Sequence, residues 1–344
     1  RPSKMGSGAS SIEGAKGCKT PLHFAAQTGH DSVVEQLLEA KAAVDVKEND
    51  NGKTPLHYAV LNGHTSVVQR LLEAKAAVDA KDEEGRTPYD LAKEFGHQKV
   101  MGLLHPAVPE VSKPADVEAE PEEAKDDVMS QEDLAEADKA EAEGCQDILE
   151  AAKENKVGAI RHFLASDVNS VQKTDEEGKT PLHLAAANGH DSVVERLLEA
   201  KVTVDAESKL GRTPLILAAE KGHVSVLQRL LEAKAALDAK NNMGRTPLIL
   251  AAEKGHDGVV QRLIAAKAVV DAKENEEGKT PLHFAAAKGH VSALQLLIEA
   301  KAVVDAKSTY GRTPLYYAAW SGHDVVVERL LEAKAAVDAT DNDG

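Results

Sequence analysis

Histidine is the first residue type to consider for chemistry, because an imidazole can bind a metal or exchange a proton near neutral pH. The chain has 14 histidines among its 344 residues. Only His105 and His162 lie outside two recurring positions. A residue type that recurs once per repeat has a structural role, so we expect these rings to hydrogen-bond turn backbone rather than to bind metal. Four follow Thr-Pro-Leu and eight follow a glycine: His23, His57, His183 and His283, then His30, His64, His97, His190, His223, His256, His290 and His323.

Two short motifs look like ligand-binding loops, but their spacing is wrong. Gly-Lys-Thr ends a phosphate-binding loop in other proteins, which needs a glycine five residues before its last glycine. Here Lys47, Lys173 and Lys273 stand at that place. A calcium loop around Gly52 would start at Lys47 and end at Tyr58, and neither is a calcium ligand. With no Ser-His-Asp or Cys-His arrangement apart from the repeats, we predict no enzyme, no metal site and no cofactor.

Charge and cysteine content limit the partners and the compartment. The net charge is −16, and no basic stripe is present, which argues against nucleic acid. No apolar run approaches the ~20 residues of a membrane span. The two cysteines, Cys18 and Cys145, are far apart and fit no metal spacing, so we expect free thiols. These features predict an intracellular protein, in the cytoplasm or, as an open alternative, in the nucleus.

The N-terminal stretch "MGSGAS", from Met5 to Ser10, matches the pattern for N-myristoylation at Gly6. The pattern applies only if translation starts at Met5. The alternative is a flexible tail without a lipid.

The tripeptide Thr-Pro-Leu recurs along the chain, and neighbouring copies lie 33 or 34 residues apart, apart from one longer step. A period of this size marks a solenoid of stacked repeats. In one copy Thr180 is a good N-cap, Pro181 suits the first helical turn, and Gly189 suits the left-handed helix end. A second helix follows, for which Ser192 and Glu195 fit a capping box. Each repeat therefore predicts two short helices and a finger, with the apolar faces buried by stacking.

This pattern resembles the ankyrin repeat. The resemblance is carried by "TPLH" followed by "AA", by "GH" between the helices, by "VV" and "LL" in the second helix, and by the "AVDA" finger. It covers about residues 18–105 and 144–344. Two departures are Lys75, where the family often has glycine, and Asp79, where it often has asparagine. The resemblance implies an all-α solenoid of helix-turn-helix units, each of about 33 residues with a β-hairpin finger.

We expect four parts along the chain. Residues 1–17 form a flexible tail, and residues 18–105 form a first array of about three repeats, the last being a cap. Residues 106–143 form a proline-containing acidic linker, since the stretch from Ala107 to Glu143 has 14 acidic and 3 basic residues. Residues 144–344 form a second array of about six repeats, and its C-terminal end is expected to be truncated.

The first repeat of the second array is degenerate and lacks Thr-Pro. Its alanines and its pair of large apolar residues lie 34 positions before their counterparts in the next repeat. We expect residues 145–177 to fold as a helical pair that stacks as a cap on the Thr180 repeat. The side chains predicted to be buried are Ile148, Ala151, Ile160 and Leu164.

The resemblance implies a scaffold that binds an unidentified partner protein through its finger tips and the exposed side of its first helices. The alternative is the regulatory ankyrin region of a larger enzyme, ligase or channel. Sequence beyond Gly344 would distinguish the two.

Three repeats of the second array differ from the others in a way that predicts a binding surface. The residue before the finger glycine and the residue after Thr-Pro-Leu are both apolar in these repeats and polar in most others. The same repeats carry arginine after the finger glycine. The only tryptophan, Trp320, lies in the last of them. Exposed apolar residues beside arginine and an aromatic ring are typical of binding hot spots. The predicted residues are Leu210, Arg212, Ile216, Met243, Arg245, Ile249, Tyr310, Arg312, Tyr316 and Trp320.

Overall fold

The structure is a computed structural model that describes residues 19–104, 138–139 and 141–342. Its contacts divide the chain into two compact units. One holds Arg1–Ala107 with Tyr310–Arg312 and Ala336–Gly344, and the other holds Val108–Thr309 and Thr313–Ala335. The predicted tail, Gly6 and most of the predicted linker lie outside the described residues.

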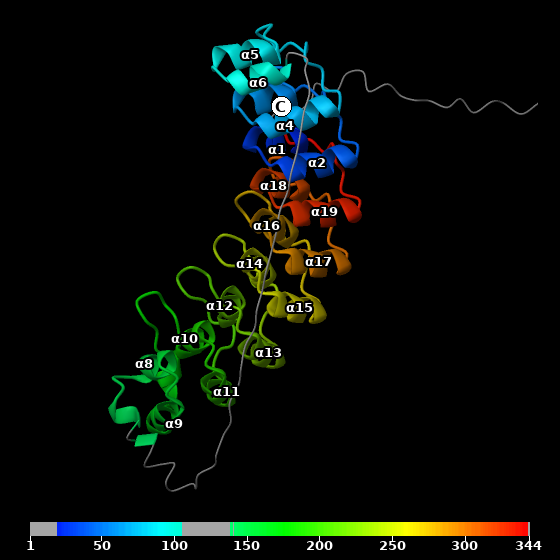
Figure 1. Cartoon of the computed structure of the whole chain (residues 1–344). Coiled ribbons are helices and arrows are strands. Elements are labelled where there is room, and N and C mark those ends of the chain that lie inside the picture. Colours follow the sequence, from blue (N-terminus) through cyan, green and yellow to red (C-terminus); the bar gives the residue numbers. More distant parts are fainter. Residues whose placement is uncertain (1–18, 105–137, 140, 343–344) are drawn as a thin grey trace, which may run out of the picture. The chain divides into compact units, whose positions relative to one another are not determined.

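In its described residues, the first unit has three helix pairs, each made of a first and a second helix (Figure 1). The first helices contact one another in chain order, and so do the second helices. This is the layered stacking of a solenoid. The pairs are α1 (Pro21–Thr28) with α2 (Asp31–Glu39), α3 (Pro55–Leu61) with α4 (Thr65–Glu73), and α5 (Pro88–Glu94) with α6 (Gln98–Leu104).

The second unit repeats the same arrangement with more pairs, and in Figure 1 its first and second helices form two rows. Its degenerate first pair is α8 (Ile148–Lys153) with α9 (Val157–Ser166), followed by the short 3₁₀ helix η1 (Val168–Gln172). The further pairs are α10 (Pro181–Asn188) with α11 (Asp191–Glu199), α12 (Pro214–Lys221) with α13 (Val224–Glu232), α14 (Pro247–Lys254) with α15 (Asp257–Ala265), α16 (Pro281–Lys288) with α17 (Val291–Glu299), and α18 (Pro314–Ser321) with α19 (Asp324–Glu332).

Local sequence explains where the first helices start and end. Thr180 has extended backbone at the N-cap of α10, Pro181 begins the helix, and Gly189 closes it at φ +75°. The second helices start differently from the prediction. Helix α11 begins at Asp191 after a histidine N-cap and has no side-chain cap hydrogen bond, so the capping box of Ser192 is wrong. The glycine turn leads directly into α11 and places Ser192 inside its first turn.

Lysine takes an unusual backbone conformation just after each second helix except α6 and α9. Lys234 has φ +62°, in the left-handed region that glycine adopts without strain. Its N–H donates to the Leu231 carbonyl, and the Ala235 N–H donates to the Leu230 carbonyl, which makes a Schellman motif. The same conformation occurs at Lys41, Lys75, Lys201, Lys267, Lys301 and Lys334.

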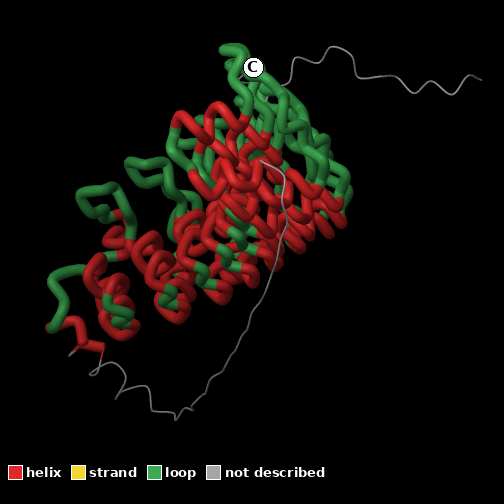
Figure 2. The backbone as a smooth tube through the Cα atoms, turned by 45° about the horizontal axis from the view of Figure 1, so that its top comes forward, coloured by secondary structure: helices red, strands yellow, loops and turns green. Residues whose placement is uncertain are grey.

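The fingers are tight turns rather than hairpins. In one finger the Ser208 N–H donates to the Arg212 carbonyl and the Gly211 N–H donates to the Ser208 carbonyl. Successive fingers are joined by one backbone bond, such as Asn242 N–H to the Leu210 carbonyl at 3.1 Å. The described residues contain no strand, so the all-α solenoid is confirmed and the β-hairpin finger is not. Figure 2 shows these loops along one side of the helices.

Small side chains build the core between the helix layers. Leu182, Ala185 and Ala186 of α10 are buried, as are Val193 and Leu197 of α11. The alanines allow neighbouring helices to approach closely, so each layer contributes little volume and many contacts. A chain with only 3% aromatic residues can therefore bury a continuous core.

The degenerate repeat stacks on the Thr180 repeat, because α8 contacts α10 and α9 contacts α11. Ile148, Ala151 and Ile160 are fully buried, as predicted. Leu164 is only partly buried, so this part of the prediction is wrong. It lies in the last turns of α9, which among the described helices contacts the second helix α11 on one side only.

Part of the predicted linker is helical and contacts α9. Residues 138–139 and 141–143 are helical, and Ala142 is buried. The Glu141 carboxylate accepts from the Ala159 N–H at 3.0 Å, and Asp138 pairs with Arg161. Gly158 makes room for this segment, since a Cβ there would lie 2.5 Å from Glu141 Oε2.

Candidate functional site

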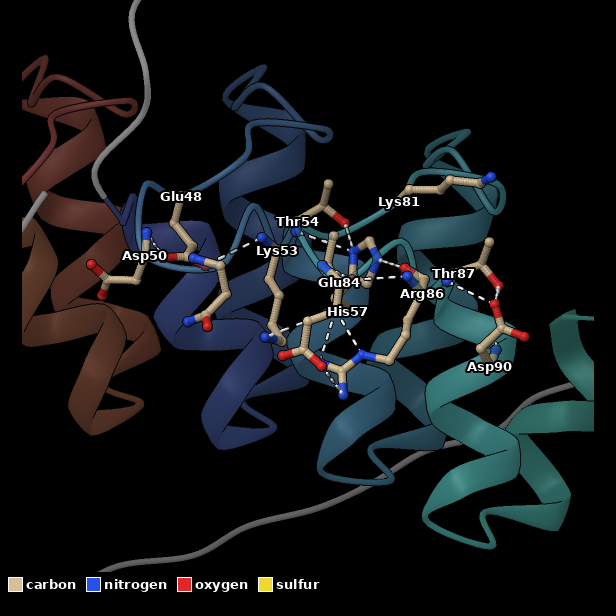
Figure 3. Close-up of polar contacts among 12 residues, drawn as sticks. Glu48, Asp50, Lys53, Thr54, His57, Lys81, Glu84, Arg86, Thr87 and Asp90 are labelled. Carbon is tan, nitrogen blue, oxygen red and sulfur yellow. Dashed lines mark hydrogen bonds and ion pairs between the residues drawn. The ribbon is translucent and has the colours of Figure 1, made fainter.

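The histidines after Thr-Pro-Leu join each repeat to the next. The Thr54 N–H donates to Nδ1 of His57 at 3.2 Å, and Nε2 of His57 lies 3.3 Å from the Arg86 carbonyl of the following finger (Figure 3). Because Nδ1 accepts, the ring is neutral and Nε2 carries the proton. His23 makes the same pair of contacts with Thr20 and the Lys53 carbonyl. The structural role predicted for these histidines is confirmed.

Burial keeps these rings neutral. His23 is fully buried, and burial lowers its pKa to about 4, although the hydrogen bond to the Lys53 carbonyl opposes the shift. Burial also lowers the pKa of His57 and of His183. A neutral imidazole that is enclosed and bonded at both nitrogens cannot act as a general base on a substrate. These positions are therefore structural.

The histidines after glycine bond backwards to the preceding repeat. Nε2 of His223 lies 3.1 Å from the Ala187 carbonyl near the end of α10. Its ring covers Gly189, where a Cβ would come within 2.6 Å of Nδ1. The glycine therefore serves both the left-handed turn and the close approach of the next repeat. The same bond is made by His64, His97, His190, His256, His290 and His323.

One buried polar side chain closes each finger turn. The Asp82 carboxylate accepts from the backbone N–H groups of Glu84 and Arg86 and pairs with the Arg86 guanidinium at 3.0 Å. Burial raises the pKa of Asp82, but the bonds from Arg86 outweigh it, so the pKa is lowered overall. Lys53 lies 3.9 Å away and adds a second positive charge. The Asp82 carboxylate is therefore engaged in holding the finger turn.

Four of the predicted binding residues are exposed. Leu210 is 56% exposed and Met243 43%, and both lie at finger tips of the second unit. Trp320 is 47% exposed at the end of α18. Tyr310 is 42% exposed, but it belongs with the other unit, where the Arg312 guanidinium lies 5.2 Å from its ring centre.

Three other predicted residues are buried. Ile216 and Ile249 are inaccessible, and Tyr316 is 2% exposed. They occupy the third position of α12, α14 and α18, where other repeats carry the buried histidine. Ile249 packs against Ala272 and Phe284. The two apolar positions that vary together in sequence therefore face different environments, one exposed at the finger tip and the other in the core.

The arginines of these fingers are paired within their own repeats. Arg212 lies 3.2 Å from Glu220 and Arg245 lies 3.0 Å from Glu253. The glutamates are the next-to-last residues of α12 and α14, so this helix position faces the finger. Trp320 occupies the same position in α18, where it stacks on Tyr316 at 6.2 Å between ring centres. Leu210, Met243 and Trp320 thus share the side that the fingers and first helices border.

Sequence reasoning missed an aromatic cluster beside this surface. The Arg245 guanidinium lies 5.0 Å from the Phe284 ring centre, and Lys279 lies 4.7 Å from that of Tyr317. The Tyr317 hydroxyl donates to Glu277 at 3.2 Å. The available signal was an aromatic residue directly after the third helix position, as at Phe284. These cation–π contacts hold the finger cations over the first helices.

No catalytic or metal-binding arrangement was found in the part of the chain that the structure describes. No group of three potential metal ligands occurs among those residues. None of the helices described has the length and apolar character required to cross a membrane. Among the residues described, the exposed apolar side chains Leu210 and Met243 at the finger tips are not part of the core.

Comparison with known proteins identifies the repeats. The family model described as "Ankyrin repeats (3 copies)" matches residues 22–113, 132–207, 148–241, 201–274 and 259–341. Together these matches cover well over half of the chain. No curated protein matches the chain.

Proposed function

Because the chain belongs to the ankyrin repeat family, we propose that it is a scaffold that binds a partner protein through finger tips and first helices of its second array. Ankyrin repeats are in general protein–protein interaction modules. The observation that carries the proposal is the exposure of Leu210 and Met243 at consecutive finger tips. The equivalent residues in most other repeats are polar, such as Asn51 and Glu177.

The backbone under these two side chains supports a binding role. The Leu210 carbonyl accepts from Asn242 at 3.1 Å, and the Met243 carbonyl accepts from Asn275 at 2.9 Å. The tips are therefore fixed to neighbouring fingers before any partner arrives. A partner that buries them loses little conformational freedom of the scaffold, which favours tight association.

Trp320 extends the surface along the first helices. Its ring is exposed, and stacking on the buried Tyr316 orients it. Tryptophan is enriched among residues that dominate binding energy. The proposed surface thus contains Leu210, Met243 and Trp320, with Arg212 and Arg245 beside them. Ile216, Ile249 and Tyr316 support it from below, and Tyr310 and Arg312 are left out because they fall in the other unit.

A matched pair of variants tests the proposal. Leu210→Ser, Met243→Ser and Trp320→Ser together should abolish recovery of the partners captured by the unaltered chain, as identified by mass spectrometry. Val269→Ser and Val303→Ser remove exposed apolar side chains that follow the second helices, 53% and 54% exposed, and should leave recovery unchanged. Far-ultraviolet circular dichroism should be unaltered in both. Equal recovery by all three proteins would refute this surface.

A further inference from the structure

A row of unpaired lysines borders the proposed surface. Lys221, Lys254 and Lys288 are the last residues of α12, α14 and α16, three first helices that contact one another in order. All three are exposed. Among the described residues, none of the three has an acidic partner within salt-bridge distance, in contrast to Arg212 and Arg245. Their positive charges are therefore available to a ligand.

Two of the three lysines, Lys221 and Lys254, lie in the repeats that carry the exposed apolar tips Leu210 and Met243, and Lys288 lies in the following repeat. The equivalent helix position is Asn188 in α10 and Ser321 in α18. Lys209, next to Leu210, adds a fourth exposed cation. The pattern that places Leu210 and Met243 at the tips therefore also concentrates positive charge beside them.

The sign of this charge is opposite to that of the chain. The net charge is −16. At the finger tips, residues 209–212 and 242–245, and at the last two positions of α12 and α14, five basic residues face two acidic ones, and both acids are paired with arginines: Lys209, Arg212, Lys221, Arg245 and Lys254 against Glu220 and Glu253. A positive face on an acidic protein selects partners by electrostatic complementarity.

We propose that this face binds an extended acidic segment of a partner protein, with apolar side chains placed between its acids. The inference rests on the proposed function and names the chemistry of the partner. Acidic side chains would pair with Lys221, Lys254 and Lys288, and apolar ones would cover Leu210 and Met243.

The spacing of the lysines fits an extended chain. Neighbouring packed helices lie about 8–10 Å apart. Three residues of a segment in the extended polyproline II conformation span about 9 Å, and side chains three residues apart then point to the same side. An acid at every third residue would therefore meet one lysine per repeat, and the two residues between them reach toward the finger tips. A nucleic acid would match the charge, but its backbone has no apolar group for Leu210 and Met243.

The test uses the full chain and a labelled synthetic peptide of repeated Glu-Leu-Ser, with fluorescence anisotropy as the readout. The peptide should bind, and replacing its glutamates by glutamine or its leucines by serine should weaken binding at least about tenfold. Lys221→Gln, Lys254→Gln and Lys288→Gln together should weaken it by a similar factor and reduce its salt dependence.

A second lysine set provides the control. Lys201→Gln, Lys234→Gln and Lys267→Gln change the net charge equally in the same unit, at the ends of second helices, and should leave binding unchanged. Absence of peptide binding, equal weakening by both sets, or tighter binding of an oligothymidine than of the peptide would overturn the inference. A further outcome is that the triple lysine variant still recovers the natural partner that the Leu210, Met243 and Trp320 variant loses. In that case the proposed acidic partner is wrong, and the proposed function stands.

Discussion

Gly29 and His64 approach each other so closely that a Cβ on Gly29 would lie 2.7 Å from His64 Nδ1. The two residues belong to neighbouring repeats, and Nε2 of the same ring lies 3.1 Å from the Gln27 carbonyl. The recurring glycine and histidine therefore form a contact between repeats: each histidine ring packs against the glycine of the preceding repeat.

Gly29→Ala should destabilise the first array more than Gly96→Ala does. Both glycines have positive φ, so alanine is strained at either by about 1–2 kcal/mol. Gly96 has no atom near its Cβ position, whereas Gly29 has the His64 ring. Native-state hydrogen exchange over residues 19–104 measures the free energy of opening. Equal losses for the two variants would show that the ring contact is not what requires glycine.

Lys234→Gly should stabilise the second array. A side chain at φ +62° costs about 1–2 kcal/mol, and glycine removes this cost while adding about 0.5–1 kcal/mol of unfolded-state entropy. The expected net gain is about 0–1.5 kcal/mol in the free energy of unfolding. Lys234→Ala is the control, because it removes the charge but keeps the Cβ, and should bring no gain. A gain in the alanine variant would assign the effect to charge instead.

Ile160→Ala should lower the free energy of unfolding by about 2–5 kcal/mol, because the Ile160 side chain of α9 is fully buried. Leu164→Ala in the same helix should cost clearly less, since Leu164 is only partly buried. Hydrogen exchange over residues 145–177 compares the two. A larger loss for Leu164→Ala would mean that α9 buries a different face from the one described.

The first helices were predictable because their signals are local. Thr180, Pro181 and Gly189 act on the backbone within a few residues of their own positions, and each has the expected conformation. The period then implies stacking, since two short helices alone cannot bury their apolar faces.

The features that the sequence did not predict depend on contacts between repeats. Ile249 and Met243 vary together in sequence, yet only the stacked structure shows that one packs on Phe284 and the other is exposed. Lys75 was noted as a departure from glycine, but its left-handed conformation follows from the Schellman bonds that end α4. Tyr317 was overlooked because its partners, Lys279 and Glu277, lie one repeat earlier.

The buried histidines make the first array sensitive to acid. In the folded chain His23 stays neutral down to pH about 4, its lowered pKa, whereas in the unfolded chain it takes up a proton near its ordinary pKa of 6.5. Acid therefore favours the unfolded state. The stabilisation is complete above pH 6.5 and is lost as the pH falls from 6.5 towards 4. Protonation would also place a hydrogen on Nδ1, which faces the Thr20 N–H at 3.1 Å.

We expect the free energy of opening of the first array to fall by about 2 kcal/mol from His23 alone between pH 7 and pH 5. His23→Ile should remove this part of the pH dependence, since the chain itself places isoleucine at the equivalent buried position in Ile216 and Ile249. Hydrogen exchange over residues 19–104, corrected for intrinsic rates at each pH, measures the change. His162→Gln, in the second array, should leave it unaltered. If the isoleucine variant loses as much stability as the parent between pH 7 and pH 5, His23 does not remain neutral when the array folds.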